Sequence, residues 1–157
     1  MIDLDQVDPN FRADLLESDN SVLAVARKYV REDWEVFVPE LEIRPDPGLR
    51  RQYRDAGDLF VRCPPGKAWL RVEVKVAKSW TSGSWPAPWR TTIVGNTYKW
   101  DHGLPIWAFY VLRADYGRAI VFYSTARPYF EARENHAGGR RQVAYYAPTE
   151  LAEELVL

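Results

Sequence analysis

The chain has 157 residues, of which 46% are hydrophobic and 27% charged, a balance that excludes intrinsic disorder and predicts one folded domain spanning residues 1–157. The formal net charge is −1, but residues 1–20 carry six acids and one base, and residues 149–157 carry three acids and no base. The intervening residues therefore sum to +7. This gradient is compatible with a basic phosphate-binding surface between acidic termini, and equally with the ordinary preference of acids for helix starts and tails.

The cysteine content and the apolar runs indicate the compartment. A lone Cys63 excludes an internal disulfide and a cysteine-rich zinc site, and it favours a reducing interior. The longest apolar stretch, residues 106–112, falls far short of the roughly 20 residues that span a bilayer. The opening MIDLDQVDPN lacks the basic start and apolar run of a secretory signal. The sequence therefore predicts a cytoplasmic protein without a membrane segment.

The first predicted element is a helix. Residues 1–18 show no sustained periodicity and are expected to form an irregular lead-in with at most a short helical turn. Asp19 or Asn20 can cap the helix, because apolar residues then recur at helical spacing to about Asp33 while charged residues occupy the other face.

A strand and a loop are expected next. Residues 34–43 read as one strand with a disturbance near Pro39. Residues 44–57 are rich in proline, glycine and arginine, which is typical of a loop. The arginines of this loop, together with one just beyond it, are Arg44, Arg50, Arg51, Arg54 and Arg62.

A hairpin is predicted at the centre of the chain. A short strand over residues 58–62 is separated by the turn 64–67 from a second strand over residues 69–77. The second strand alternates strictly, with Val72 and its apolar neighbours on one face. The charged residues on the opposite face are Arg71, Glu73 and Lys75.

The second half of the chain predicts a long loop followed by strands. Residues 78–100 contain several tryptophans and no clear period, which is typical of a functional lid or binding segment. Further elements are expected as strands over 106–112, 119–124 and 142–146, a weak helix over 128–137, and a short terminal helix capped by Thr149. The expected fold is an α/β domain with a mixed central sheet of about five strands flanked by helices.

The strongest chemical signal is the pairing of Asp58, at a strand start, with Glu73 and Lys75 on the next strand. Two carboxylates held close together repel each other unless a cation lies between them, and oxygen ligands suit Mg²⁺ or Mn²⁺. Such an ion can activate water and stabilise the charge that develops in phosphodiester cleavage, while Lys75 holds the water or neutralises the phosphate. The Glu-x-Lys pattern alone is also explained by a solvated strand face.

The order of helix, strand, Asp58, hairpin and VEVKVAK resembles the PD-(D/E)xK nuclease superfamily. The segment DLFVRCPPGKAWLRVEVKVAK is similar in layout to archaeal Holliday-junction resolvases and related phage and repair nucleases, and the resemblance covers roughly residues 19–125. It implies a restriction-endonuclease-like core, metal binding by Asp58 and Glu73, and assistance to the attack by Lys75. The sequence departs from the family name at Ala56-Gly57, which precede Asp58 where proline is implied.

Residues outside the hairpin supply further candidates for the site. Many members supply a glutamate from the first helix, and Glu17 is the nearest candidate, with Asp19 behind it. Lys78, Arg90 and Lys99 are candidates for substrate binding, and the loop tryptophans offer flat faces for unstacked bases, although core packing explains most of them at least as well.

His102 has two interpretations. It precedes a glycine turn, where a structural role is typical, and it is also a candidate acid or second ligand at the phosphate.

The sequence thus predicts a Mg²⁺- or Mn²⁺-dependent DNA endonuclease, with a structure-selective resolvase or a phage or repair enzyme among the options. A two-fold homodimer is the simplest way to cut both strands of a duplex. A first alternative is a noncatalytic nucleic-acid-binding or assembly subunit that retains the fold. A second is an enzyme of different chemistry on an unrelated fold, which would be favoured if Asp58 and Glu73 faced apart.

Overall fold

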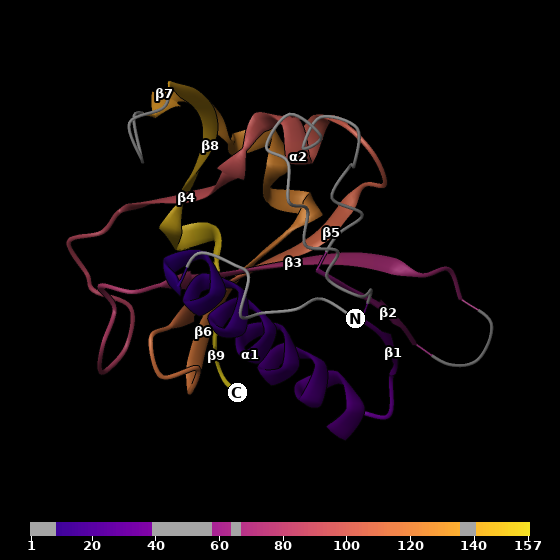
Figure 1. Cartoon of the computed structure of the whole chain (residues 1–157). Helices are drawn as coiled ribbons and strands as arrows, with labels where there is room; N and C mark the ends of the chain where they lie inside the picture. Colours follow the sequence, from indigo (N-terminus) through magenta and orange to yellow (C-terminus); the bar gives the residue numbers. More distant parts are fainter. Residues whose placement is uncertain (1–8, 39–57, 64–66, 136–140) are drawn as a thin grey trace.

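A computed structural model describes the backbone of residues 9–38, 58–63, 67–135 and 141–157, and within these ranges the side chains from residue 20 onward (Figure 1). The protein is a mixed α/β structure. Its elements are α1 Pro9–Arg31, β1 Glu35–Phe37, β2 Leu59–Arg62, β3 Leu70–Ala77, β4 Thr91–Asn96, α2 Thr97–Asp101, β5 Ile106–Arg113, β6 Arg118–Tyr123, the 3₁₀ helix η3 Ser124–Tyr129, β7 Glu131–Asn135, β8 Gln142–Pro148, the 3₁₀ helix η5 Thr149–Leu151 and β9 Glu153–Val156. Among the described residues, no helix is both long enough and apolar enough to cross a membrane.

The strands form two sheets. A six-stranded sheet has the order β1-β2-β3-β5-β6-β9, and a three-stranded sheet has the order β4-β8-β7. In the larger sheet β3 and β5 are parallel and the remaining neighbours are antiparallel. Parallel neighbours need a crossover connection, and here the crossover contains β4 and α2. The crossover therefore carries α2 back over the middle of the larger sheet.

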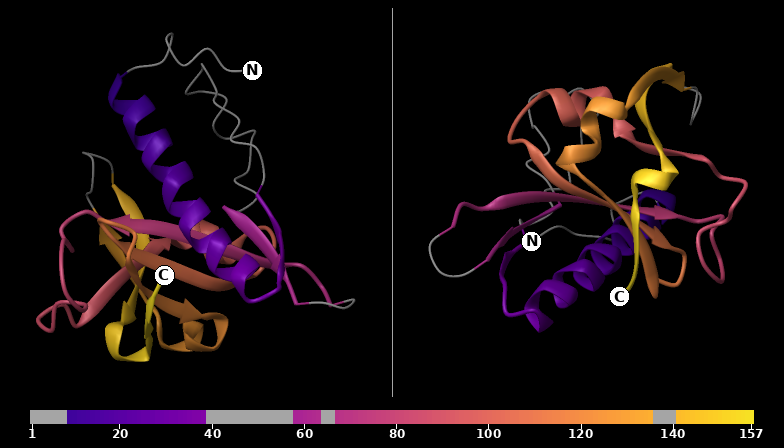
Figure 2. Two further views of the ribbon diagram at one scale, coloured as in Figure 1. Left: turned by 90° about the horizontal axis from the view of Figure 1, so that it is seen from below. Right: turned by 180° about the vertical axis from the view of Figure 1, so that it is seen from behind.

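The two faces of the larger sheet have different covers (Figure 2). Helix α1 packs on one face, where apolar residues such as Val25, Tyr29, Val72 and Tyr110 are buried together. The three-stranded sheet and α2 cover β5 and β6 on the second face, around residues such as Phe122. Strand alternation explains the division, because successive side chains of β5 and β6 join opposite clusters.

On the second face of the larger sheet, the apolar residues of β5 and β6 are followed by charged residues on β3. There the inward positions hold Arg71 and Glu73, which are buried, and Lys75, which is exposed. Beyond β3 the same face carries Phe60 from β2 and Phe37 from β1, since Phe37 is opposite Phe60 and Phe60 is opposite Arg71 in the strand register. The polar residues thus lie at the border between the part of this face that α2 and the three-stranded sheet cover and the part that no described element covers.

The prediction of a mixed α/β structure with a mixed central sheet is confirmed, but a second sheet rather than a further long helix covers much of one face, and several local expectations are wrong. Helix α1 begins at Pro9, so the expected irregular lead-in over residues 1–18 is helical from residue 9. Proline suits the first turn of a helix because its ring fixes φ at a helical value. Once the first turn of a helix has formed, each further residue is added at little cost in free energy. The helix therefore runs through residue 19, near which the sequence predicted its start. The arginine loop and the hairpin turn at 64–66 lie outside the described residues.

The expected loop over residues 78–100 contains β4 and α2 instead. Trp80 and Trp100 are buried, and Trp80, Trp85 and Trp89 pack edge to face with ring centroids 5.1 and 5.2 Å apart. The interpretation of these tryptophans as packing residues is therefore confirmed. Strand β4 was not predicted from the sequence, because its apolar residues do not alternate. Its partner, β8, lies about fifty residues further along the chain.

The end of the chain is strand rather than helix. The expected helix over residues 128–137 is replaced by η3 and the edge strand β7, whose side chains are mostly exposed and so lack an alternating pattern. Thr149 begins the short η5, but its hydroxyl bonds that of Thr92 at 2.8 Å, and β9 follows to complete the larger sheet.

Candidate active site

Asp58 and Glu73 are brought together by the β2–β3 hairpin. Leu59 is opposite Val72 in the antiparallel register, which places the preceding Asp58 beside Glu73. Asp58 Oδ2 accepts a 2.7 Å hydrogen bond from the Val74 amide. Burial and the negative charge of Glu73 raise the pKa of Asp58 to about 8. The two carboxylates do not face apart, so the condition that would favour a different chemistry is not met.

Glu73 is fully buried, with 0% of its surface exposed, and its partner Arg71 is only 3% exposed. Arg71 Nε and Nη2 lie 2.8 and 2.6 Å from Glu73 Oε1. Arg71 Nη1 also donates to the Leu104 carbonyl at 3.0 Å. The chain reaches this point through Gly103, whose φ of 76° favours glycine and whose added Cβ would lie 3.4 Å from Arg71 Nη1. Arg71 therefore fixes the Glu73 carboxylate in one orientation.

A second cation reaches Glu73 from α2. Lys99 Nζ lies 3.5 Å from Glu73 Oε2, the oxygen that Arg71 does not bind. The helix is anchored at its start, because Asn96 Oδ1 accepts the Lys99 amide at 3.0 Å. Lys99, predicted as a substrate-binding residue within a loop, is thus held at the carboxylates by a capped turn of helix.

Lys75 completes the group two residues beyond Glu73. It belongs to the same face of β3, and its side chain is exposed. Partial desolvation and the positive charge of Lys99 lower its pKa. Asp58, Glu73, Lys75 and Lys99, with Arg71 behind them, are called the carboxylate centre below.

The donors of the carboxylate centre fit a hard divalent cation. Among the described residues, no three His, Cys, Asp or Glu side chains gather closely enough to hold an ion by themselves. Mg²⁺ needs only one or two carboxylates when waters and phosphate oxygens complete its shell. Arg71 and the Val74 amide each donate to one oxygen of a carboxylate, Glu73 Oε1 and Asp58 Oδ2 respectively. Asp58 and Glu73 are the residues that would hold the cation, and Lys99 lies beside Glu73 Oε2.

Two other predicted substrate-binding residues lie apart from this centre. Lys78 is exposed just beyond the end of β3. Arg90 is exposed at the start of β4, the end remote from α2, and its carbonyl accepts the Thr149 amide at 2.8 Å. The structure therefore brings Lys99 to the carboxylates but not Arg90.

Of the remaining candidates, the structure describes the side chain of His102 but not those of Glu17 and Asp19. His102 ends α2 in an exposed position, its ring stacked on Tyr98 with centroids 4.2 Å apart and its Nδ1 3.3 Å from the Tyr98 carbonyl. These contacts account for His102 as a structural residue. Glu17 and Asp19 belong to α1, but their side chains lie outside the described residues.

Arg71 is the residue of the carboxylate centre to which sequence analysis assigned no role. The available signal was its position two residues before Glu73 on the same face of a strictly alternating strand. In a solvated strand such a charge would be unremarkable. Its importance follows from burial, which the sequence pattern does not reveal.

Comparisons with protein-family models, with curated proteins and with solved structures found no match to this chain.

Proposed function

We propose that this protein is a Mg²⁺- or Mn²⁺-dependent deoxyribonuclease with a restriction-endonuclease-like core. The observation that carries the proposal is the carboxylate centre: two adjacent carboxylates with Arg71 and Lys75 on β3 and Lys99 from α2, next to the apolar cluster around Phe122. The helix, strand and hairpin order behind the nuclease resemblance corresponds to α1, β1 and β2–β3. Burying charges is costly, so a cluster of this kind is typical of a functional site.

Each residue has a distinct role in the proposed reaction. Asp58 and Glu73 would hold the metal, which when bound supplies Lewis-acid stabilisation and a more acidic water. Arg71 is a positioning residue, since it fixes the orientation of Glu73. Lys75, with its lowered pKa, orients the attacking water or stabilises charge on the phosphate, and Lys99 binds a phosphate oxygen beside Glu73.

One observation favours the noncatalytic alternative. Arg71 and Lys99 together already compensate the charge of Glu73, so the centre is electrostatically satisfied to a large extent by the chain itself. A subunit that binds nucleic acid through Lys75 and Lys99 without cutting it would keep this arrangement. The retention of all three motif residues favours the nuclease.

The deciding experiment is cleavage of labelled DNAs (single-stranded, duplex, flapped and four-way) and a matched RNA, with Mg²⁺, Mn²⁺ or EDTA. We expect metal-dependent cutting that falls about 100-fold or more in Glu73→Gln, which removes a metal ligand, and in Lys75→Ala, which removes a group acting on the water or the phosphate. Glu150→Gln, an exposed acid on η5, is the matched control and should cut normally. Cutting that persists in EDTA or in Glu73→Gln would contradict the proposal.

A further inference from the structure

An aromatic surface adjoins the carboxylate centre on the same sheet face. Phe37 is 55% exposed and Trp69 is 43% exposed, and Phe60 lies between the strands that carry them, half-buried. The Phe37 and Phe60 rings are 6.4 Å apart, and the Arg62 guanidinium lies 4.5 Å from the Trp69 ring centroid. These three aromatic residues are called the aromatic strip.

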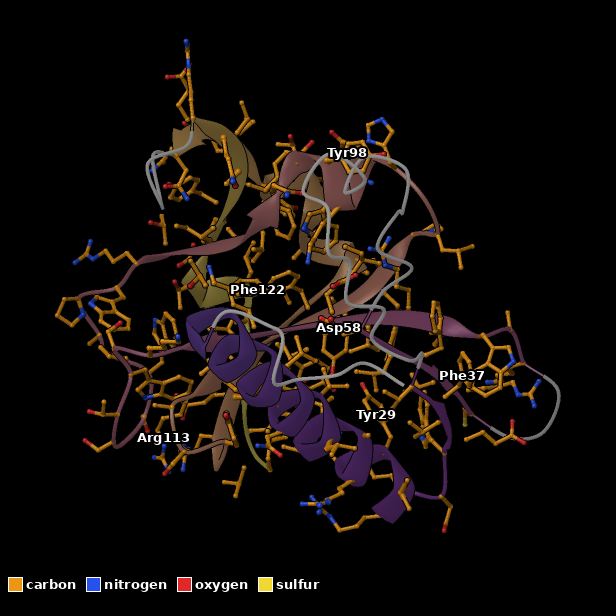
Figure 3. All side chains as sticks on the ribbon, in the orientation of Figure 1. Tyr29, Phe37, Asp58, Tyr98, Arg113 and Phe122 are labelled. Atoms are coloured by element: carbon orange, nitrogen blue, oxygen red, sulfur yellow. The ribbon has the colours of Figure 1, made fainter. Side chains whose placement is uncertain are left out.

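The strand register ties the strip to the centre. Phe37 is opposite Phe60, and Phe60 is opposite Arg71, so the three side chains form one row across β1, β2 and β3. Asp58 precedes Phe60 by two residues, and Glu73 follows Arg71 by two, which places the carboxylates in the next row of the same face. In Figure 3, Asp58 lies between Phe122, in the covered part of the molecule, and Phe37.

The charge of this surface and its exposed aromatic rings together indicate which kind of ligand it binds. The strip and the centre carry the bases Arg62, Arg71, Lys75 and Lys99 against the acids Glu35, Asp58 and Glu73. Before any metal binds, the excess of positive charge is one when Asp58 is ionised and two when it is protonated. A polyanion is therefore favoured. Exposed aromatic rings on a flat sheet stack unpaired bases, whereas an intact duplex keeps its base faces stacked inside.

We propose that the aromatic strip binds an unpaired DNA strand, whose bases stack on Phe37 and Trp69 while its backbone leads into the carboxylate centre. The inference rests on the proposed nuclease function and narrows it. The substrate class is DNA with an unpaired strand, such as a single-stranded end, a flap or the open arm of a branch, rather than uninterrupted duplex.

The first test measures binding without cleavage. Fluorescently labelled 15-nucleotide poly(dT) and a 15-base-pair duplex are titrated in EDTA with the wild type, Phe37→Ala, Phe37→Trp and Tyr129→Ala. Tyr129 is the matched control, because it is 66% exposed on η3, away from β1–β3. We expect Phe37→Ala to weaken single-strand binding about tenfold with duplex binding changed less than twofold, and Phe37→Trp to restore it.

The outcomes separate this inference from the proposed function. A wild type that binds duplex as tightly as single strand, or an equal loss in Tyr129→Ala, would overturn the aromatic strip as a strand-binding surface even if metal-dependent cutting is found. Selective loss in Phe37→Ala without any cutting would support the strip and contradict the nuclease. Light scattering that shows a dimer dissociated by Phe37→Ala would overturn the inference in favour of a second copy of this chain as occupant.

Discussion

Strands β3 and β5 lie side by side and parallel, yet they bury different chemistry. Strand β5 is buried along nearly its whole length by apolar residues such as Phe109 and Val111. Strand β3 is buried over Arg71, Val72 and Glu73, so two of its three innermost residues are charged. Glu73 is paired with Phe109 in the register, and the change from a benzyl ring to a carboxylate occurs between direct neighbours.

This contrast shows that the free-energy cost of burying charged groups falls on β3 and not on β5. A hydrophobic side chain in place of a buried ion pair of similar volume is often neutral or stabilising, so packing alone does not require Arg71 and Glu73. The covered part of the face, over β5 and β6, is built for stability. The border at β3 holds charges that must be fully compensated, which is why Arg71 contacts both Glu73 and the Leu104 carbonyl.

Among the substitutions that test this contrast, Arg71→Met should lower the free energy of unfolding the most. This change leaves the buried Glu73 without its main partner, and we expect a loss of about 3–5 kcal/mol in the free energy of unfolding. Urea denaturation followed by circular dichroism measures the loss. Adding Glu73→Gln to Arg71→Met should restore part of it, since the uncompensated charge is then gone. A double variant that is as unstable as the sum of the two single variants would refute the coupling.

On the neighbouring strand, Val111→Ala tests ordinary packing. The side chain is buried in the cluster around Phe122, so deleting two methyl groups should cost about 2 kcal/mol. We expect the same loss at pH 5 and pH 8 and no change in the metal requirement of cutting. A loss that varies strongly with pH would mean that β5 is electrostatically linked to the carboxylate centre.

The third prediction concerns pH. The pKa of Asp58 is raised from its usual value near 4 to about 8, so between these pH values the native state holds a proton that the unfolded chain releases. In EDTA the stability should therefore fall as pH rises from 5 to 8, and Asp58→Asn should remove this slope. Asp115 and Glu154 have lowered pKa values, so they titrate below about pH 4.5, outside the range from pH 5 to pH 8. A slope retained in Asp58→Asn would assign it to another group.

The smallest effect on stability is expected for Lys99→Met. Its ammonium is 3.5 Å from Glu73 and its side chain is partly exposed, so the free energy of unfolding should change by about 1 kcal/mol or less. The effect should appear in cleavage instead, as a rise in KM that becomes smaller at high salt, because a phosphate contact is lost. An unchanged KM would remove Lys99 from the substrate-binding residues.

Local sequence patterns predicted the hairpin and the pairing of its charges because both depend on short-range geometry. Strict alternation placed Arg71, Glu73 and Lys75 on one face, and the antiparallel pairing of β2 with β3 brought Asp58 beside them. Strands β4 and β7 were missed because neither carries a periodic signal of its own: the apolar residues of β4, Ile93 and Val94, are adjacent rather than alternating, and the side chains of β7 mostly face solvent.

The sequence by itself determined that the chain forms a mixed α/β domain and that two carboxylates and a lysine converge, since strand alternation and a tight turn are local properties of the chain. The tertiary structure alone decided which of these charges are buried and which cations reach them. Burial of Glu73 depends on the layers packed around β3, and the arrival of Lys99 depends on a crossover that returns α2 over the sheet. Packing between distant segments sets both, and no pattern within β3 or α2 encodes them.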